Sequence, residues 1–179
     1  WYEKAASQGF AKAQYNLGIM YDNGKGVEKD SKKAFEWYEK AASQGFADAQ
    51  YKLGFMYYDG EGVEKNSKKA FEWYEKAASQ GFAKAQYNLG LMYDKGEGVE
   101  KDSKKAIEWY EKAATQGLAI AQFSLGLMYD KGEGVKQDYK KAFEWYEKAA
   151  SQGFAKAQYN LGIMYDNGKG VEKDSKKAF

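Results

Sequence analysis

The sequence predicts an all-α protein, an α/α superhelical solenoid of about five helix-turn-helix repeats of 36 residues each. Three observations lead to this fold class. Tryptophan recurs at a constant spacing of 36 residues, and nearly everything between the tryptophans repeats as well, at Trp1, Trp37, Trp73, Trp109 and Trp145. Each copy contains two stretches with the periodicity of an amphipathic helix, separated by turns that contain glycine. Such a period is typical of supersecondary units that stack and bury their apolar faces on one another.

The repeats predict a single array over the whole chain. The units lie at roughly 1–36, 37–72, 73–108, 109–144 and 145–179. Residues 1–35 and 145–179 are identical, so four copies form a unit of 144 residues that has begun to repeat. A recent duplication, a designed closure and a window on a longer array would all produce this identity, and the sequence does not distinguish them.

The first helix of a repeat is predicted over about 30–45. Its N-cap is assigned to Asp30, because this column holds Asp or Asn in every copy, whereas the next column becomes Tyr139, which cannot cap. At about 100° per residue, Trp37 and Tyr38 fall on the apolar face with the alanines. We call this element the Trp-Tyr helix, and we expect its aromatic side chains to pack in the core.

The second helix is predicted over about 47–57. Gly45 ends the preceding helix in a left-handed conformation, with Phe46 folding back on it. Gly54 lies inside the second helix, where glycine costs about 1 kcal/mol relative to alanine, yet every copy has it. We attribute this glycine to the close approach of a neighbouring helix or of a packed aromatic ring. Leucine there should overpack the interface, and alanine should be mild. Turn residues 60–63 end the helix.

The composition excludes several classes of function. The chain has no Cys, no His and no Arg, which removes thiol chemistry, the usual general base and the bidentate phosphate-binding fork. The net charge is only +2 and the lysines alternate with acidic residues, which is not the segregated basic surface of a nucleic-acid binder. No apolar run approaches the roughly 20 residues that span a bilayer. We therefore predict a protein that is not an enzyme, with no cofactor, no metal, no nucleic-acid partner and no membrane insertion. The compartment is left open.

The segment AQYNLGIMYDNGKGVEKDSKKAFEWYEKAASQG, residues 13–45, closely resembles the Sel1-like repeat, a near relative of the tetratricopeptide repeat. The matching signals are A-x-A-Q-x-x-L-G-x-x-Y, then G-x-G-V, then D-x-x-K-A and W-Y-x-K-A-A-x-Q-G, and they cover the whole chain. The resemblance implies a right-handed solenoid acting as a non-catalytic scaffold or adaptor, whose concave groove binds a protein or peptide. Such arrays are common in bacteria. Some secreted bacterial relatives carry a cysteine pair in each repeat, and this chain has none.

The differences between copies are concentrated on one face of the second helix. The second, third and fourth copies differ from the first at 22 positions, and 12 of these fall in six columns. An even spread would place about four there, since six is one sixth of 36 columns. We call these columns the second-helix stripe, and in the first copy they hold Lys12, Tyr15, Asn16, Ile19, Asp22 and Asn23. Six comparably polar columns of the Trp-Tyr helix carry a single change, Thr115.

Two interpretations of the stripe remain open, namely drift on a permissive face and a groove in which each repeat presents different contacts. The second predicts tyrosines at the rim, aliphatic residues or Phe55 at the base, and side chains that contribute little to folding. The predicted partner-binding residues are Tyr15, Ile19, Asp48, Tyr51, Lys52, Phe55, Tyr58, Lys84, Tyr87, Asn88, Leu91, Ile120, Phe123, Ser124, Leu127, Tyr159 and Ile163.

The chain ends suggest a structural alternative, in which the array stacks end to end into a fibre or larger assembly. Trp1 and Tyr2 begin partway along a Trp-Tyr helix, and Phe179 stops partway along another. Both ends should therefore present apolar faces that a solenoid normally covers. We expect head-to-tail self-association, or else that these residues are an internal segment of a longer array.

Overall fold

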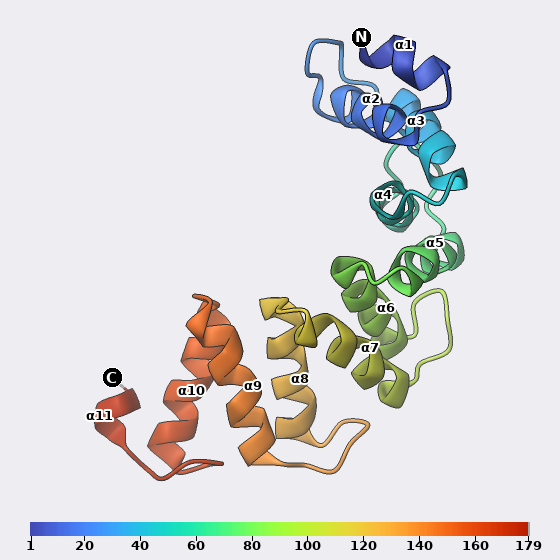
Figure 1. Ribbon diagram of the computed structural model, residues 1–179. Helices are drawn as coiled ribbons and strands as arrows, with labels where there is room; N and C mark the ends of the chain where they lie inside the picture. Colours follow the sequence, from blue (N-terminus) through green and yellow to red (C-terminus); the bar gives the residue numbers. More distant parts are fainter. Residues whose placement is uncertain (179) are drawn as a thin grey trace.

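The computed structural model describes residues 1–178, and in this range it contains helices and no strand, as the sequence predicts. Tandem repeats of two helices follow one another along the chain (Figure 1). The helices are α1 (Tyr2–Ser7), α2 (Ala11–Asn23), α3 (Ser31–Ser43), α4 (Ala47–Asp59), α5 (Ser67–Ser79), α6 (Ala83–Lys95), α7 (Ser103–Thr115), α8 (Ala119–Lys131), α9 (Tyr139–Ser151), α10 (Ala155–Asn167) and α11 (Ser175–Ala178).

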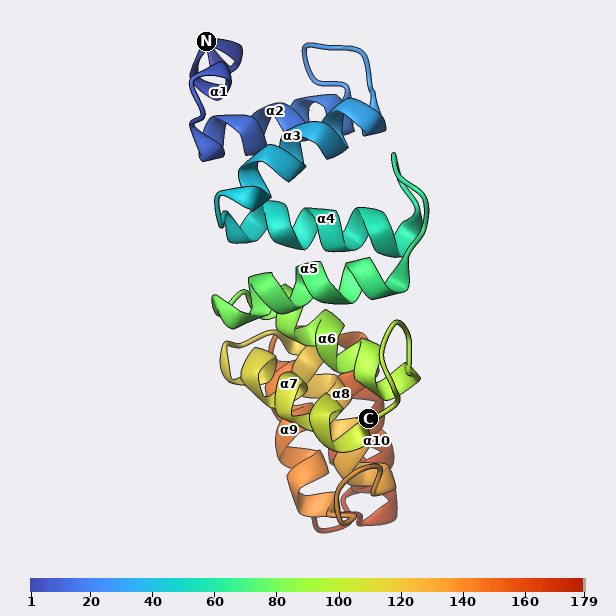
Figure 2. The ribbon, with the colours of Figure 1, turned by 90° about the vertical axis from the view of Figure 1, so that its right-hand side faces the viewer.

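The helices follow an arc, and each packs mainly against its neighbours in sequence (Figures 1 and 2). The Trp-Tyr helices are α1, α3, α5, α7 and α9, and the second helices have even numbers from α2 to α10. In Figure 1, α2 and α4 lie toward the inner side of the arc. The second helices α2, α4, α6 and α8 each pack more extensively on the Trp-Tyr helix that follows than on the one before, whereas α10 packs more on α9 than on the short α11.

The helix ends form as their local sequence predicts. The Asp30 carboxylate accepts a hydrogen bond from the backbone N–H of Lys33 at 3.0 Å, which confirms Asp30 as the N-cap of α3. Gly45 has a φ of 85°, and the N–H of Phe46 donates to the carbonyl of Ala41, as expected for a Schellman ending. Helix α4 is two residues longer than predicted, because its left-handed cap is Gly60.

The two aromatic residues of the Trp-Tyr helix differ in burial. Tyr38 and its equivalents in α5, α7 and α9 are almost completely buried, as predicted. Trp37 is only half-buried, and the ammonium of Lys40 lies 4.1 Å from the centroid of its ring. The prediction that the tryptophans belong to the core is therefore only partly correct, because the indole keeps some of its surface outside the core. The lysine ammonium lies over the ring, where a cation–π interaction stabilises it.

The tyrosine of the next repeat explains why glycine occurs at this position inside the second helix. A Cβ atom added to Gly54 would lie 2.5 Å from Cδ1 of Tyr74, which is 1% exposed. The packed aromatic ring expected from the sequence is therefore present. The site is therefore not loose, and we expect alanine to be destabilising here as well, because the buried ring must shift to accept a Cβ atom.

A chain of glutamine side chains, which the sequence analysis did not identify, links successive repeats. The amide of Gln116 donates to the side-chain oxygen of Gln86 at 2.7 Å, and Gln86 in turn donates to the carbonyl of Ala78 at 3.2 Å. The same pattern recurs with Gln14, Gln50 and Gln122. These buried amides are satisfied only when adjacent repeats are docked, so they couple the repeats into one array.

From the second copy onward, the second glycine of each turn also lies at a contact between repeats. Gly98 has a φ of 72°, and a Cβ atom there would lie 2.3 Å from the backbone oxygen of Ser67 in the preceding repeat. Gly62 stands in the same relation to Ser31. Both the left-handed backbone and the contact require glycine at this point.

Candidate protein-binding groove

The predicted binding residues lie on the second helices and extend from one repeat to the next. They are Tyr15 and Ile19 on α2, Asp48, Tyr51, Lys52, Phe55 and Tyr58 on α4, Lys84, Tyr87, Asn88 and Leu91 on α6, Ile120, Phe123, Ser124 and Leu127 on α8, and Tyr159 and Ile163 on α10. A period of 3.6 residues places the members on each helix along one face. Their solvent exposure differs from column to column. Some columns of the stripe pack between repeats, and others remain accessible to a partner.

The tyrosine column of the stripe is part of the packing between repeats. Tyr51 is half-buried, and its ring centroid lies 5.7 Å from that of Tyr74 and 5.1 Å from that of Phe82. Phe123 makes the equivalent contacts with Tyr146 and Phe154 in the next repeat. Tyr51 and Phe123 thus lie between two repeats and not at an exposed rim, so we expect them to contribute to folding, contrary to the expectation from the sequence.

The column of the stripe that holds Ile19, Phe55, Leu91, Leu127 and Ile163 lies on the same face as the tyrosine column. Its side chains keep apolar surface accessible to solvent. Phe55 is 38% exposed, and Leu91 and Leu127 on the following two second helices are half-buried. These are the side chains at the base of the stripe that keep apolar surface in contact with solvent. Exposed apolar surface on a folded domain is a common property of protein-binding faces.

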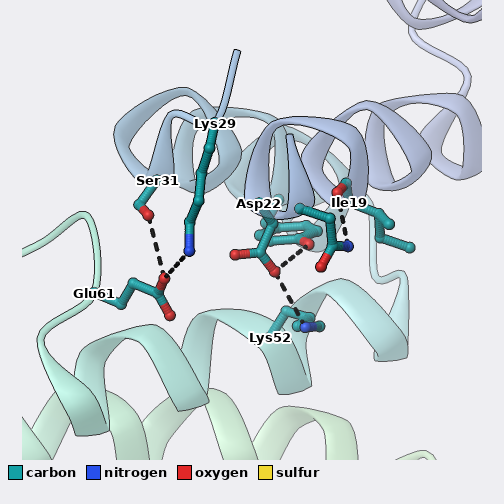
Figure 3. A network of polar contacts seen from close by, with 8 residues as sticks. Ile19, Asp22, Lys29, Ser31, Lys52 and Glu61 are labelled. Carbon is teal, nitrogen blue, oxygen red and sulfur yellow. Dashed lines mark hydrogen bonds and ion pairs between the residues drawn. The ribbon is translucent and has the colours of Figure 1, made fainter. Parts of the chain in front are cut away.

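The junction between α2 and α4 is closed by an ion pair. Figure 3 shows Asp22 of α2 pointing toward Lys52 of α4, with 3.3 Å between the carboxylate oxygen and the ammonium. The buried Tyr38 hydroxyl donates to the same carboxylate at 3.2 Å. At the edge of this junction, Glu61 accepts from Ser31 and pairs with Lys29 at 3.6 Å. Lys52 is thus committed to a contact within the chain, which the sequence did not reveal.

The next junction, between α4 and α6, has a different arrangement and is open. The aspartate column holds Tyr58 here, and the lysine column holds Asn88. Tyr58 donates to the carboxylate of Glu97. A pocket of about 130 Å³ lies at this junction, and its lining residues are Phe55, Tyr58, Asp59, Tyr74, Asn88, Leu91 and Met92.

Four of the predicted binding residues therefore meet around one pocket, namely Phe55, Tyr58, Asn88 and Leu91. Three other lining residues were missed. The change of an asparagine column to Asp59 was visible in the sequence, but Tyr74 and Met92 occur in every copy and carried no signal.

The remaining predicted residues lie outside this pocket. Lys84 and Ile120 are exposed near the first turns of α6 and α8, while Asp48 at the start of α4 is half-buried. Tyr159 and Ile163 on α10 are 71% and 40% exposed. The structure thus brings together the stripe residues of α4 and α6 and distributes the others along the array.

The phenols of Tyr58 and Tyr74 at the pocket stay neutral at physiological pH. The hydrogen bond to Glu97 raises the pKa of Tyr58 to about 12. Burial raises the pKa of Tyr74 and Tyr110 further above the ordinary value. A phenol with a raised pKa serves as a hydrogen-bond donor and is a poor general base near neutral pH.

Two properties of residues 1–178 limit the kinds of site present. No cluster of three acidic side chains in this range is arranged to hold a metal ion. None of the helices in the same range has both the length and the apolar composition of a membrane span.

A family model and several solved structures match the chain. The model of the Sel1 repeat matches residues 1–10, 11–46, 47–82, 83–118, 119–154 and 155–179. These units begin ten residues later than those counted from the tryptophans. The family model thus pairs each second helix with the Trp-Tyr helix that follows it, which for α2, α4, α6 and α8 is also the more extensive packing in the structure. No curated protein matches the chain significantly.

Three bacterial structures illustrate the likeness. The protective antigen c5321 of uropathogenic Escherichia coli matches with a TM-score of 0.98 and 40% identity over 99% of this chain, which spans 38% of that protein. A Sel1 repeat protein from Oxalobacter formigenes matches with a TM-score of 0.92 and 42% identity, covering 97% of this chain and 71% of the other. The immunity protein Pa5087 from Pseudomonas aeruginosa matches with a TM-score of 0.60 and 31% identity, covering 99% and 65%.

The periodic sequence, the helix pairs stacked in an arc and the matching repeat model agree with one another. The chain belongs to the Sel1 repeat family, whose solenoid fold typically provides a scaffold for protein interactions.

Proposed function

We propose that this chain is a non-catalytic adaptor that binds a peptide or an exposed loop of a partner protein along the second-helix stripe. One observation carries the proposal. The columns that change between otherwise nearly identical repeats are those that bring Phe55, Tyr58, Asn88 and Leu91 around an open pocket. Drift on a permissive face would also change these columns, but it gives no reason for three of the changed residues, Phe55, Tyr58 and Leu91, to line one pocket.

The groove suits a partner because it is organised before binding. Phe55 and Leu91 lie on helices of 13 residues each, whose positions are set by the packed rings beneath them. A rigid surface loses little conformational freedom on association, so more of the contact energy appears as affinity.

Truncation of Phe55 and Leu91 tests the proposal. Partners are captured from a lysate with the intact array, identified by mass spectrometry, and measured individually by titration. The double variant Phe55→Ala/Leu91→Ala should weaken a captured partner about 30-fold, the scale of an interface hot spot. Its thermal midpoint should fall by only a few degrees, since both side chains keep part of their surface in solvent.

The matched control is the outer-face double variant Glu39→Ala/Lys76→Ala, whose two side chains are exposed on Trp-Tyr helices. It should leave the affinity unchanged and lower the thermal midpoint only slightly, because Lys76→Ala removes an ammonium that lies 4.0 Å from the centroid of the partly exposed Trp73 ring. If the outer-face variant abolishes capture while the Phe55/Leu91 variant binds normally, the groove is not the binding surface.

For a chain that has these two ends, end-to-end assembly is a second candidate function, because apolar surface is exposed at both of them. Tyr2 and Phe10 are 52% and 61% exposed, and Tyr159 at the other end is 71% exposed. The same three columns pack against one another at the internal junctions, as described above. Phe179, which also belonged to this expectation, lies outside the described residues.

Sedimentation velocity over a range of concentrations tests this assembly for a chain with these ends. The average mass should rise with concentration, because Tyr159 of one copy can receive Tyr2 of the next as the internal tyrosines do. Tyr159→Lys should suppress the rise, since a charge would be buried in the contact. A strict monomer at high concentration would exclude assembly through these ends.

A further inference from the structure

The pocket between α4 and α6 lies where two columns hold other residues than they do at the α2–α4 junction. At the α2–α4 junction the corresponding columns hold Asp22 and Lys52, which form the ion pair across the two helices. At the α4–α6 junction they hold Tyr58 and Asn88. The side chain of Asn88 is too short to repeat the bridge, and the Tyr58 hydroxyl bonds to Glu97. Within residues 1–178 no ion pair joins α4 and α6, and the pocket lies between these two helices.

The size and the lining of the pocket suit one aliphatic side chain of a ligand. An enclosed apolar cavity of about 150 Å³ in another protein admits one benzene molecule. The 130 Å³ here is bounded mostly by apolar groups of Phe55, Leu91 and Met92, with the ring of Tyr74 also in the wall. This volume suits an aliphatic side chain of the size of Leu, Ile or Met.

The charge at the pocket selects the neighbouring residue of the ligand. Asp59 lies in the pocket wall, and within residues 1–178 it forms no ion pair. The Glu97 carboxylate is compensated, because it accepts from Tyr58 and pairs with Lys95 at 3.9 Å. One acidic group beside an apolar pocket favours a cationic group next to the aliphatic one.

Resting on the proposed function, we infer that this pocket anchors a partner segment in which an aliphatic residue has Lys or Arg within two positions. The aliphatic side chain fills the pocket between Phe55 and Leu91, and the basic side chain reaches the Asp59 carboxylate. The amide of Asn88 lies in the wall and is placed to bond the backbone of an extended segment beside the anchor.

A positional-scanning library of labelled octapeptides tests the inference on the full chain. Each pool fixes one aliphatic, small or acidic residue at one position and Lys or Glu within two positions of it. Pools with Leu, Ile or Met beside Lys should bind at least about tenfold more tightly than pools with Asp in place of the aliphatic residue, or with Glu in place of Lys.

Two variants separate the parts of the site. Tyr58→Asp/Asn88→Lys installs the residues of the α2–α4 junction and should close the pocket, removing the aliphatic preference. Asp59→Asn should keep the aliphatic preference and lose about threefold of the preference for Lys. Circular dichroism should show unchanged helix content in both, because each new side chain is tolerated in its column or on the surface.

The possible results are distinct. If Tyr58→Asp/Asn88→Lys keeps the wild-type preference while Phe55→Ala/Leu91→Ala loses binding, the groove binds peptides but this pocket is not the anchor. If no pool binds the wild-type chain more tightly than it binds Phe55→Ala/Leu91→Ala, peptide binding by the groove is overturned together with this inference.

Discussion

Replacing Gly54 by leucine is expected to lower the free energy of unfolding by about 3 kcal/mol or more, and alanine by about 1–3 kcal/mol. The physical reason is the ring of Tyr74, whose Cδ1 and Cε1 atoms lie 2.5 and 2.6 Å from the position of an added Cβ. The ring is buried between two repeats, so relief of the overlap requires the repeats to separate. Urea denaturation followed by circular dichroism measures the change.

Gly162 provides a matched control in the same column and in a closely similar helical sequence. Among the described residues, the nearest atom to an added Cβ there is the backbone oxygen of Ala178, at 3.4 Å, which is ordinary contact. Gly162→Ala should therefore be neutral or stabilising by up to about 1 kcal/mol, as helix propensity predicts for alanine over glycine. If alanine has equal effects on stability at positions 54 and 162, the contact with the tyrosine ring is not the reason for glycine in this column.

Truncating Phe123 to alanine is expected to cost about 3 kcal/mol of stability, although it belongs to the second-helix stripe. Its ring centroid lies 5.7 Å from that of Tyr146 and 5.2 Å from that of Phe154, so removal leaves a cavity between two repeats. The free energy of unfolding from urea titration provides the measurement.

The control for Phe123 is Tyr159, the same column one repeat later. Its side chain is 71% exposed, so Tyr159→Ala should change stability by less than about 0.5 kcal/mol. A small effect at both positions would mean that the ring column is dispensable for folding, as was first expected from the sequence. A large effect at Phe123 alone means that binding studies of the stripe should use Phe55 and Leu91, whose truncation is less disruptive.

The sequence by itself determined the features that depend on residues close together in the chain. The 36-residue spacing determined the repeat length, and Asp30 and Gly45 marked the limits of the Trp-Tyr helix, because caps and turns are formed by a few consecutive residues. The family resemblance determined the fold class, which the repeat model and the solved structures confirmed. The count of changes between copies identified the second-helix stripe before any packing was known.

Only the tertiary structure decided how deep each side chain of that stripe lies. Helical periodicity gives the direction of a side chain from its own helix, but it does not give the distance to the neighbouring repeat. Tyr51 lies between two repeats, whereas Phe55 keeps part of its ring in solvent, and one face of one helix carries both. The open pocket also depends on the partners that Tyr58 and Asn88 find or lack across a junction. Those contacts join residues 30 or more positions apart, so packing of the whole array was needed to reveal them.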